Sequence, residues 1–201
     1  YQAVMALRVQ PCTGATAVYS AMHGVGGRFV VEALRRGGHS GLIVEPSQFE
    51  PDGTFPTVSF PNPEEPGAMD RSLALAKAKG ADLVLANDPD ADRLAVGVRR
   101  PDGEYQMLTG NEVGLLLAET LLREGEWSGQ AMVATTIVSS TMLQKIAAAH
   151  GALYAETLTG FKWIANEAIA HDEGGGSFVL GFEEALGYSV GSVVRDKDGV
   201  S

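Results

Sequence analysis

Short apolar runs alternate with amphipathic segments through the first half of the chain. Four runs rich in Val, Leu and Ala predict buried strands, at 15–21, 41–46, 81–86 and 94–98. The segments 28–36 and 67–80 have helical periodicity, and glycine follows or ends each of them. Five prolines in 47–66 predict a long loop. The pattern of this half therefore predicts a β-α-β-loop-α-β unit, whose last strand begins at Leu94.

The second half repeats this architecture without repeating the sequence. After a turn at 100–104, Thr109 and Glu112 have the spacing of a capping box ahead of a helix. Strands are predicted at 131–138, 152–158 and 177–182, and helices at 112–125, 140–151 and 161–176. We therefore expect an α/β protein of two similar domains with mixed sheets flanked by helices, covering 1–104 and 105–201.

Composition narrows the classes of protein and partner. The chain has 201 residues, 45% of them hydrophobic, and a net charge of −10, which disfavours binding to nucleic acid or an anionic membrane. No apolar run approaches the ~20 residues that span a bilayer. The one cysteine, Cys12, excludes an internal disulfide and fits a reducing compartment. With no signal peptide in the sequence, we expect a cytoplasmic protein.

Three aspartates stand on alternate positions in "NDPDADRLA", between two predicted strands. Carboxylates at Asp88, Asp90 and Asp92 can point inward together on a tight loop, an arrangement that a hard cation such as Mg²⁺ favours. Such a site commonly keeps a position for a phosphate oxygen. Arg93 follows at once and could hold a phosphate through two parallel hydrogen bonds.

Three other interpretations of this loop can be tested on the same residues. An EF-hand loop needs Gly at its sixth position and Glu at its twelfth, where this chain has Arg93 and Arg99, so it is excluded. A haloacid-dehalogenase-type phosphatase would use Asp88 as nucleophile but wants Thr or Val where Asp92 stands. A polar turn with solvated aspartates is the remaining alternative, although three aspartates between buried strands are rare in such turns.

A glycine turn, "HGVGGRF", follows the first predicted strand. Gly24 and Gly26, with Glu45 at the end of the next strand, match part of a dinucleotide-binding fingerprint. Phe29 occupies the position of the third glycine, so a tight strand-to-helix turn is the favoured interpretation. His23 at this turn has no assigned role, and a hydrogen-bonded structural histidine is favoured over a catalytic one.

With its aspartate loop, the chain resembles the α-D-phosphohexomutase family, which includes phosphoglucomutases and phosphomannomutases. The family's magnesium loop reads D-G-D-x-D-R, and Pro89 replaces the glycine here. Further stretches resemble family motifs in the family's order, over nearly the whole chain: "AMHGVGG", "FPNPEEP", "ETLTGFKWI", "GFEEALGY" and "RDKDGVS". The last two look most like the phosphoglucomutase/phosphopentomutase branch.

The resemblance implies roles for the aspartate loop. Asp88, Asp90 and Asp92 match the family's Mg²⁺ ligands, and in the family this metal also binds the phosphate of an active-site phosphoserine. Arg93 matches the arginine beside that centre.

It also implies roles in the second half. Thr159 and Gly160 match a loop that faces the bound sugar phosphate, and Glu183 matches the acid that binds sugar hydroxyls. The serine that accompanies this acid is replaced by Ala185, which puts the family's usual substrate selection in doubt. Lys197 matches a suspected general acid/base, although a solvated lysine is the simpler interpretation of the residue alone.

The implied activity is that of a phosphosugar mutase. A phosphoserine and a bisphosphate intermediate would move a phosphoryl group between positions 1 and 6, or 1 and 5, of a hexose or pentose phosphate. The chain resembles only the second and third of four domains, the third without its last helix. The phosphoserine domain and the fourth domain would be its partners, and the segment alone is expected to be inactive. The rival hypotheses are a non-catalytic sugar-phosphate-binding module and a Mg²⁺-dependent phosphatase.

Overall fold

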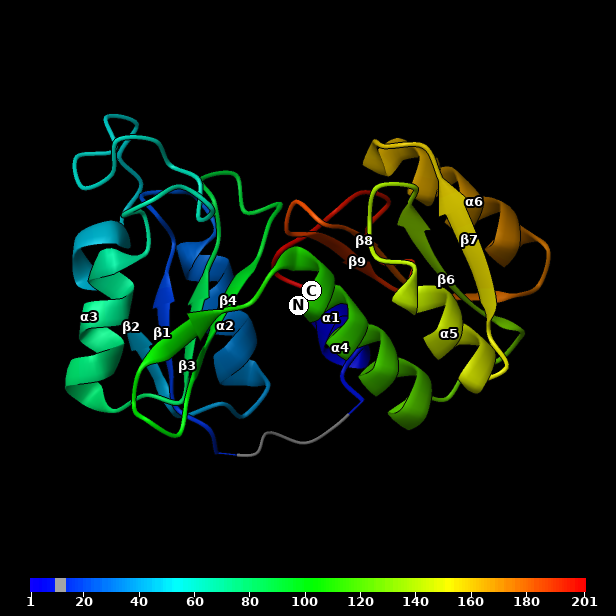
Figure 1. Cartoon of the computed structure of the whole chain (residues 1–201), viewed down its shortest axis with the longest axis horizontal. Coiled ribbons are helices and arrows are strands. Elements are labelled where there is room, and N and C mark those ends of the chain that lie inside the picture. The colour runs from blue at the N-terminus through cyan, green and yellow to red at the C-terminus, as the bar shows by residue number, and fades with distance from the viewer. Residues whose placement is uncertain (10–13) are drawn as a thin grey trace. The chain divides into compact units, whose positions relative to one another are not determined.

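A computed structural model describes residues 1–9 and 14–201, which form two units, each built around its own sheet (Figure 1). The first unit covers residues 14–108, and the second covers 109–199 together with residues 2–9. Both sheets are mixed and flanked by helices, which confirms the predicted α/β class with two similar domains. Cys12 lies outside the described residues.

The first sheet has the strand order β2-β1-β3-β4-β5. Its strands are β1 (Ala17–Ser20), β2 (Leu42–Val44), β3 (Leu83–Ala86), β4 (Ala95–Arg99) and β5 (Tyr105–Met107). β1 pairs in parallel with β2 and β3, whereas β3, β4 and β5 are joined by antiparallel pairings. Because β1 and β3 are parallel neighbours, the loops that follow them, 21–26 and 87–94, begin at the same edge of the sheet.

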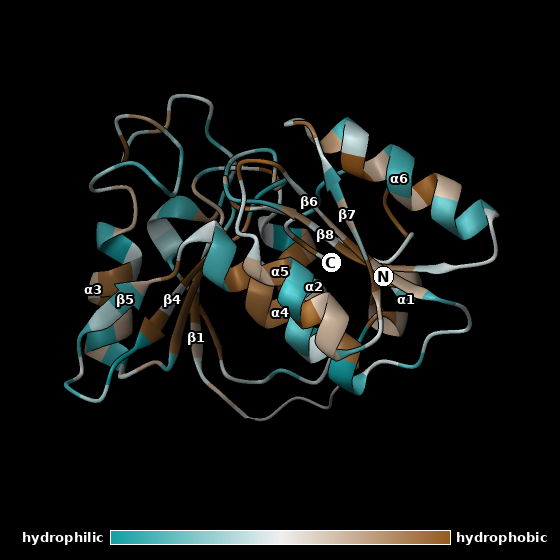
Figure 2. Ribbon diagram, turned by 45° about the vertical axis from the view of Figure 1, so that its right-hand side comes forward, coloured by the Kyte–Doolittle hydropathy of each residue, from teal (hydrophilic) through white to brown (hydrophobic). Residues whose placement is uncertain are grey.

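Helices cover both faces of this sheet. They are α2 (Gly27–Arg36) and α3 (Asp70–Lys79), which lie on opposite sides of the strands in Figure 1, with a short 3-10 turn η1 (Pro46–Gln48) in the long loop. Tyr19 and Ala21 pack with Val30 of α2 on one face. β1 is buried along its whole length, as expected for a strand covered on both faces, and the apolar residues of β1 and β4 are brown in Figure 2.

The second sheet has the order β7-β6-β8-β9. Its strands are β6 (Ala131–Thr136), β7 (Leu153–Thr157), β8 (Ser177–Glu183) and β9 (Gly187–Val190). β6 pairs in parallel with β7 and β8, and β9 returns antiparallel to β8. The unit's helices are α1 (Gln2–Ala6), α4 (Gly110–Glu124), α5 (Met142–Ala149) and α6 (Phe161–Glu173). Figure 1 shows α6 on one face of the sheet and α4 and α5 on the other.

The start of α4 is fixed by the predicted capping box. Glu112 N donates to Thr109 Oγ1 at 3.2 Å, and Thr109 N donates to Glu112 Oε2 at 2.8 Å. One turn later, Gly114 lets α4 lie directly on β8, because a methyl group there would come within 2.4 Å of the Phe182 ring. Phe161 and Ile164 of α6 fill the opposite face.

Three elements depart from the sequence-based expectation. The strands β5 and β9 and the helix α1 were not predicted, and each is five residues or shorter. Because β5 pairs with β4, the structure divides the units after Leu108, whereas the sequence placed the division near residue 104.

Among the described residues, no helix combines the length and apolar character needed to cross a membrane.

Candidate functional site

The aspartate loop joins β3 to β4 at the carboxyl edge of the first sheet. One oxygen from each of Asp88, Asp90 and Asp92 can be chosen so that all three lie within 4.8 Å of one another. Asp90 is exposed, whereas only 9% of Asp88 is accessible. The structure therefore brings the three predicted metal ligands together.

The electrostatics of this cluster favour a cation. Burial, together with the charges of Asp92 and Asp90, raises the pKa of Asp88 to about 6, although a hydrogen bond from the Arg93 backbone and the charge of Arg93 lower it. The donor set consists of carboxylate oxygens alone, as Mg²⁺ prefers, and three of them leave room in an octahedral shell for water or phosphate oxygens. The residues present fit a magnesium ion.

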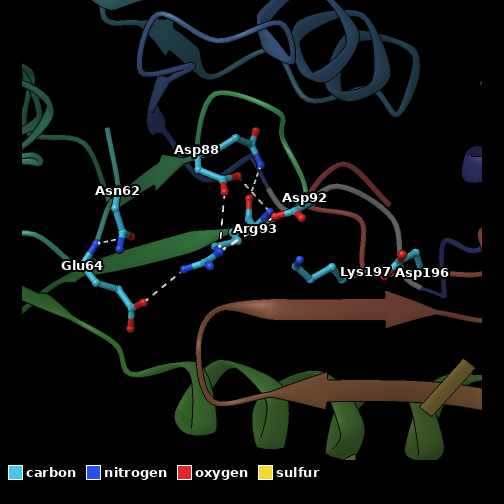
Figure 3. A network of polar contacts seen from close by, with 8 residues as sticks. Asn62, Glu64, Asp88, Asp92, Arg93, Asp196 and Lys197 are labelled. Carbon is cyan, nitrogen blue, oxygen red and sulfur yellow. Dashed lines mark hydrogen bonds and ion pairs between the residues drawn. The ribbon is translucent and has the colours of Figure 1, made fainter. Parts of the chain in front are cut away.

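Arg93 lies among carboxylates from two loops. Its guanidinium is 3.6 Å from Asp88, 3.9 Å from Asp92 and 3.6 Å from Glu64 (Figure 3). The backbone N–H of Glu64 donates to Asn62 Oδ1, a local turn that fixes this part of the "PNPEE" loop. Sequence reasoning did not find the Glu64–Arg93 pair, because 29 positions of chain separate two residues in different motifs.

The second unit brings Gly160 and Glu183 together. Thr159 and Gly160 lie between β7 and α6, and Glu183 ends β8. Both positions are at the carboxyl edge of the parallel strands, and the Gly160 N–H donates to Glu183 Oε1 at 2.8 Å. Gly160 has φ 117°, a conformation that favours glycine. Ala185 lies in the turn between β8 and β9.

Lys197 lies beside the same hairpin. Glu183 and Gly187 are directly paired across β8 and β9, and a methyl group on Gly187 would come within 2.9 Å of Lys197 Cδ. The backbone N–H of Asp198 donates to Tyr188 O at 2.7 Å, which attaches this segment to β9. Lys197 is thus positioned close to the hairpin that carries Glu183.

Glu184, the next residue along the chain, makes its hydrogen bonds with a different partner. Ser139 Oγ donates to Glu184 Oε2 at 2.8 Å, and Glu184 N donates back to Ser139 Oγ at 3.2 Å. Sequence reasoning missed Ser139. Its only signal was a pair of serines directly after the strand predicted at 131–138. The two adjacent glutamates therefore have separate partners, Gly160 for Glu183 and Ser139 for Glu184.

The glycine turn after β1 holds a buried histidine. His23 is 4% exposed, and its Nε2 is 2.8 Å from Thr57 Oγ1 in the long loop. Glu45, the acid of the dinucleotide alternative, is also buried and accepts a hydrogen bond from Ser47 Oγ.

Comparison with known proteins identifies both units. The family model "Phosphoglucomutase/phosphomannomutase, alpha/beta/alpha domain II" matches residues 4–103, and the model for domain III matches residues 109–201. A Schizosaccharomyces pombe protein named "Probable phosphoribomutase" is 47% identical over 189 residues, 92% of this chain and 32% of that protein. Human phosphopentomutase is 43% identical over 192 residues, 92% of this chain and 31% of that protein.

Solved structures share the fold. A Burkholderia thailandensis protein of the phosphoglucomutase/phosphomannomutase family aligns with a TM-score of 0.78 and 21% identity, over 99% of this chain and 41% of that one. Aspergillus fumigatus N-acetylphosphoglucosamine mutase, solved with GlcNAc-6P and magnesium, aligns with a TM-score of 0.58 and 18% identity, over 94% and 38%. The chain thus spans about a third of the curated relatives it matches.

The two family models together match almost every residue, in the order of domains II and III. The relatives' names, phosphoribomutase and phosphopentomutase, agree with the branch that "GFEEALGY" and "RDKDGVS" indicated. The chain belongs to the phosphoglucomutase/phosphomannomutase family.

Proposed function

We propose that this chain is the metal-binding and sugar-binding part of a phosphosugar mutase. The full enzyme would move a phosphoryl group between positions 1 and 5 of a pentose phosphate, or 1 and 6 of a hexose phosphate. The observation that carries the proposal is the cluster of Asp88, Asp90 and Asp92 beside Arg93, within a domain-II match. The names of the relatives favour a pentose phosphate as one substrate.

In this proposal the first unit handles the phosphoryl group. Asp88, Asp90 and Asp92 would hold Mg²⁺, whose charge would offset the negative charge of a transferring phosphoryl group. Arg93 would donate hydrogen bonds to phosphate oxygens, a role that suits a guanidinium better than an ammonium group. The phosphoserine itself would belong to a further domain of the family.

The second unit would recognise the sugar. Glu183 uses Oε1 to hold Gly160, and its Oε2 makes no hydrogen bond within the described part of the chain. That oxygen can accept a hydrogen bond from a sugar hydroxyl. The loop at Thr159 and Gly160 would face the bound sugar phosphate, and Lys197 would exchange a proton with a reacting hydroxyl.

A segment exchange tests this function. In human phosphopentomutase, the region aligned with this chain would be replaced by residues 1–201, and a correctly folded chimera is expected to turn over ribose 1-phosphate. The 201-residue chain alone is expected to show no turnover, even with a bisphosphate primer, because its units match only domains II and III.

Three outcomes would contradict the proposal. Turnover by the chain alone would show that the phosphoryl carrier is misplaced. A folded chimera that binds ribose 1-phosphate without turnover would favour a non-catalytic binding module. Release of inorganic phosphate through an aspartyl-phosphate on Asp88 would favour the phosphatase alternative.

A further inference from the structure

The glycine turn after β1 packs directly against the aspartate loop. A methyl group on Gly24 would lie 2.3 Å from both Cα and O of Pro89, and one on Gly26 would lie 2.6 Å from Ala91 Cβ. Between these contacts, Val25 N donates to Pro89 O at 2.8 Å. At Gly24 backbone meets backbone, and only glycine allows so close an approach. The glycines of the turn therefore allow it to pack closely against the aspartate loop.

The aspartate loop needs such support. Ala91 has φ 61°, in the left-handed region, which is unfavourable for a residue with a side chain. The three carboxylates on the loop also repel one another. A strained local conformation persists only where its surroundings fix it by several contacts. The left-handed backbone and the repulsion among the carboxylates both disfavour this loop conformation. Contacts from outside the loop must therefore stabilise it.

A second set of contacts joins the two ends of the loop. The hydroxyl of Tyr19 donates to Asn87 Oδ1 at 2.9 Å, and Asn87 Nδ2 donates to Arg93 O at 2.6 Å. Tyr19 and Asn87 are both buried, and burial raises the pKa of the Tyr19 hydroxyl, which keeps it a donor. The side chain of Asn87 thus bridges the first and last residues of the metal-binding segment, and Tyr19 orients that bridge.

The glycine turn is itself fixed by the long loop. Met22 and His23 both have left-handed backbones, with φ 50° and 60°. His23 N donates to Gln48 O at 2.8 Å, Asp52 N donates to His23 O at 3.0 Å, and the His23 ring is hydrogen-bonded to Thr57. These bonds hold Gly24 where it meets Pro89. His23 therefore stabilises the glycine turn, and the turn contacts the aspartate loop through Gly24.

We infer that the turn at 22–27, together with Tyr19 and Asn87, forms a brace that holds the aspartate loop in its metal-binding conformation before the ion arrives. The members of this brace are positioning residues, because they contact the loop and are not among its three proposed ligands. The inference rests on the proposed magnesium site and adds residues that no sequence motif assigned. Outer partners of metal ligands typically change metal affinity about 10- to 100-fold when altered.

Two variants of the full 201-residue chain test the brace. Tyr19→Phe removes one hydroxyl and should weaken divalent-ion binding about tenfold, and Gly24→Ala should weaken it about tenfold or more. The probe is Mn²⁺, which prefers the same oxygen ligands as Mg²⁺ and whose free ion is measured by electron paramagnetic resonance. Mg²⁺ competition then gives the magnesium affinity, and thermal unfolding is recorded for every variant.

Matched controls separate loss of positioning from loss of stability. Tyr105→Phe removes a similar hydroxyl that donates to Ala81 O, and Gly53→Ala adds a methyl group with nothing within 4 Å. Both lie in the first unit, and both should leave the dissociation constant unchanged. If Gly24→Ala fails to fold, Tyr19→Phe carries the test alone.

The outcomes distinguish the brace from the metal site. Ion binding by the wild type together with an unchanged dissociation constant in Tyr19→Phe overturns the brace alone, even if that variant melts earlier. Absence of ion binding by the wild type overturns the proposed magnesium site and the brace together.

Discussion

In an active chimera, Glu183→Gln is expected to lower kcat/KM for every accepted sugar phosphate by roughly ten- to a hundredfold. Gln keeps an oxygen for the Gly160 N–H, which Glu183 Oε1 accepts at 2.8 Å, so the loop should keep its shape. What is lost is the charge that a sugar hydroxyl would meet. A hydrogen bond to a charged group is worth ~1.5–3 kcal/mol, which corresponds to that range of rates.

The neighbouring acid is the matched control. Glu184 is bound by Ser139, and Gln at this position keeps an acceptor for the serine hydroxyl. Glu184→Gln should therefore leave kcat/KM nearly unchanged for ribose 1-phosphate, glucose 1-phosphate and mannose 1-phosphate. The opposite pattern, with Glu184→Gln impaired and Glu183→Gln intact, would show that the wrong glutamate has been assigned to the sugar.

The same assay tests the role of Ala185. This residue stands where the resemblance places a serine, and its methyl group offers no hydrogen bond to a sugar. Ala185→Ser should narrow the preference among the three substrates towards one hexose. Equal relative rates before and after the change would exclude this position from sugar selection.

Gly110→Ala is expected to produce a large loss of stability in the second unit. A methyl group there would lie 2.0 Å from Glu184 O and 2.9 Å from Leu186 N, so the first turn of α4 and the turn after β8 would have to separate. Overpacking typically costs about 1–3 kcal/mol, and a contact with rigid backbone should reach the upper end. The melting temperature of this unit should fall by about 4–8 °C for each kcal/mol, as expected for a domain of its size.

Tryptophan fluorescence can follow this unit by itself, because both tryptophans, Trp127 and Trp163, lie in it. The melting temperature of Gly174→Ala is the comparison. The added methyl group would lie 3.3 Å from its nearest neighbouring atom, and Gly174 is the C-cap residue of α6. If Gly110→Ala melts like the wild type, α4 does not support the turn that carries Ala185.

The sequence predicted the elements whose pattern is local. The apolar runs at β1, β3, β6 and β8 and the Thr109–Glu112 capping box were all recognisable, because burial and capping leave their mark within a few residues. The edge strands β5 and β9 were not, since three or four residues give too short a pattern, and pairing with a neighbouring strand decides their conformation.

The candidate site likewise has residues that the sequence could predict and contacts that it could not. Alternate aspartates on one loop are visible as spacing, so Asp88, Asp90 and Asp92 could be chosen from the sequence. The contacts of Glu64 with Arg93 and of Tyr19 with Asn87 join residues 29 and 68 positions apart. Such pairs depend on how strands and loops are arranged in space, which neither spacing nor composition encodes.

The magnesium site is the central claim, and a calorimetric titration of Mg²⁺ into the 201-residue chain tests it most directly. At pH 8 the Asp88 carboxyl, whose pKa is raised to about 6, is ionised. The wild type should bind one ion weakly, and Asp90→Ala should bind none. Asp90 is exposed and its charge raises the pKa of Asp88, so its removal should not destabilise the ion-free chain.

Asp70→Ala, which removes one charge from α3 in the same unit, should bind Mg²⁺ as the wild type does. This pattern, with binding lost in Asp90→Ala and kept in Asp70→Ala, is the result that the account predicts. Equal binding by the wild type and Asp90→Ala, or no binding by the wild type, would contradict it.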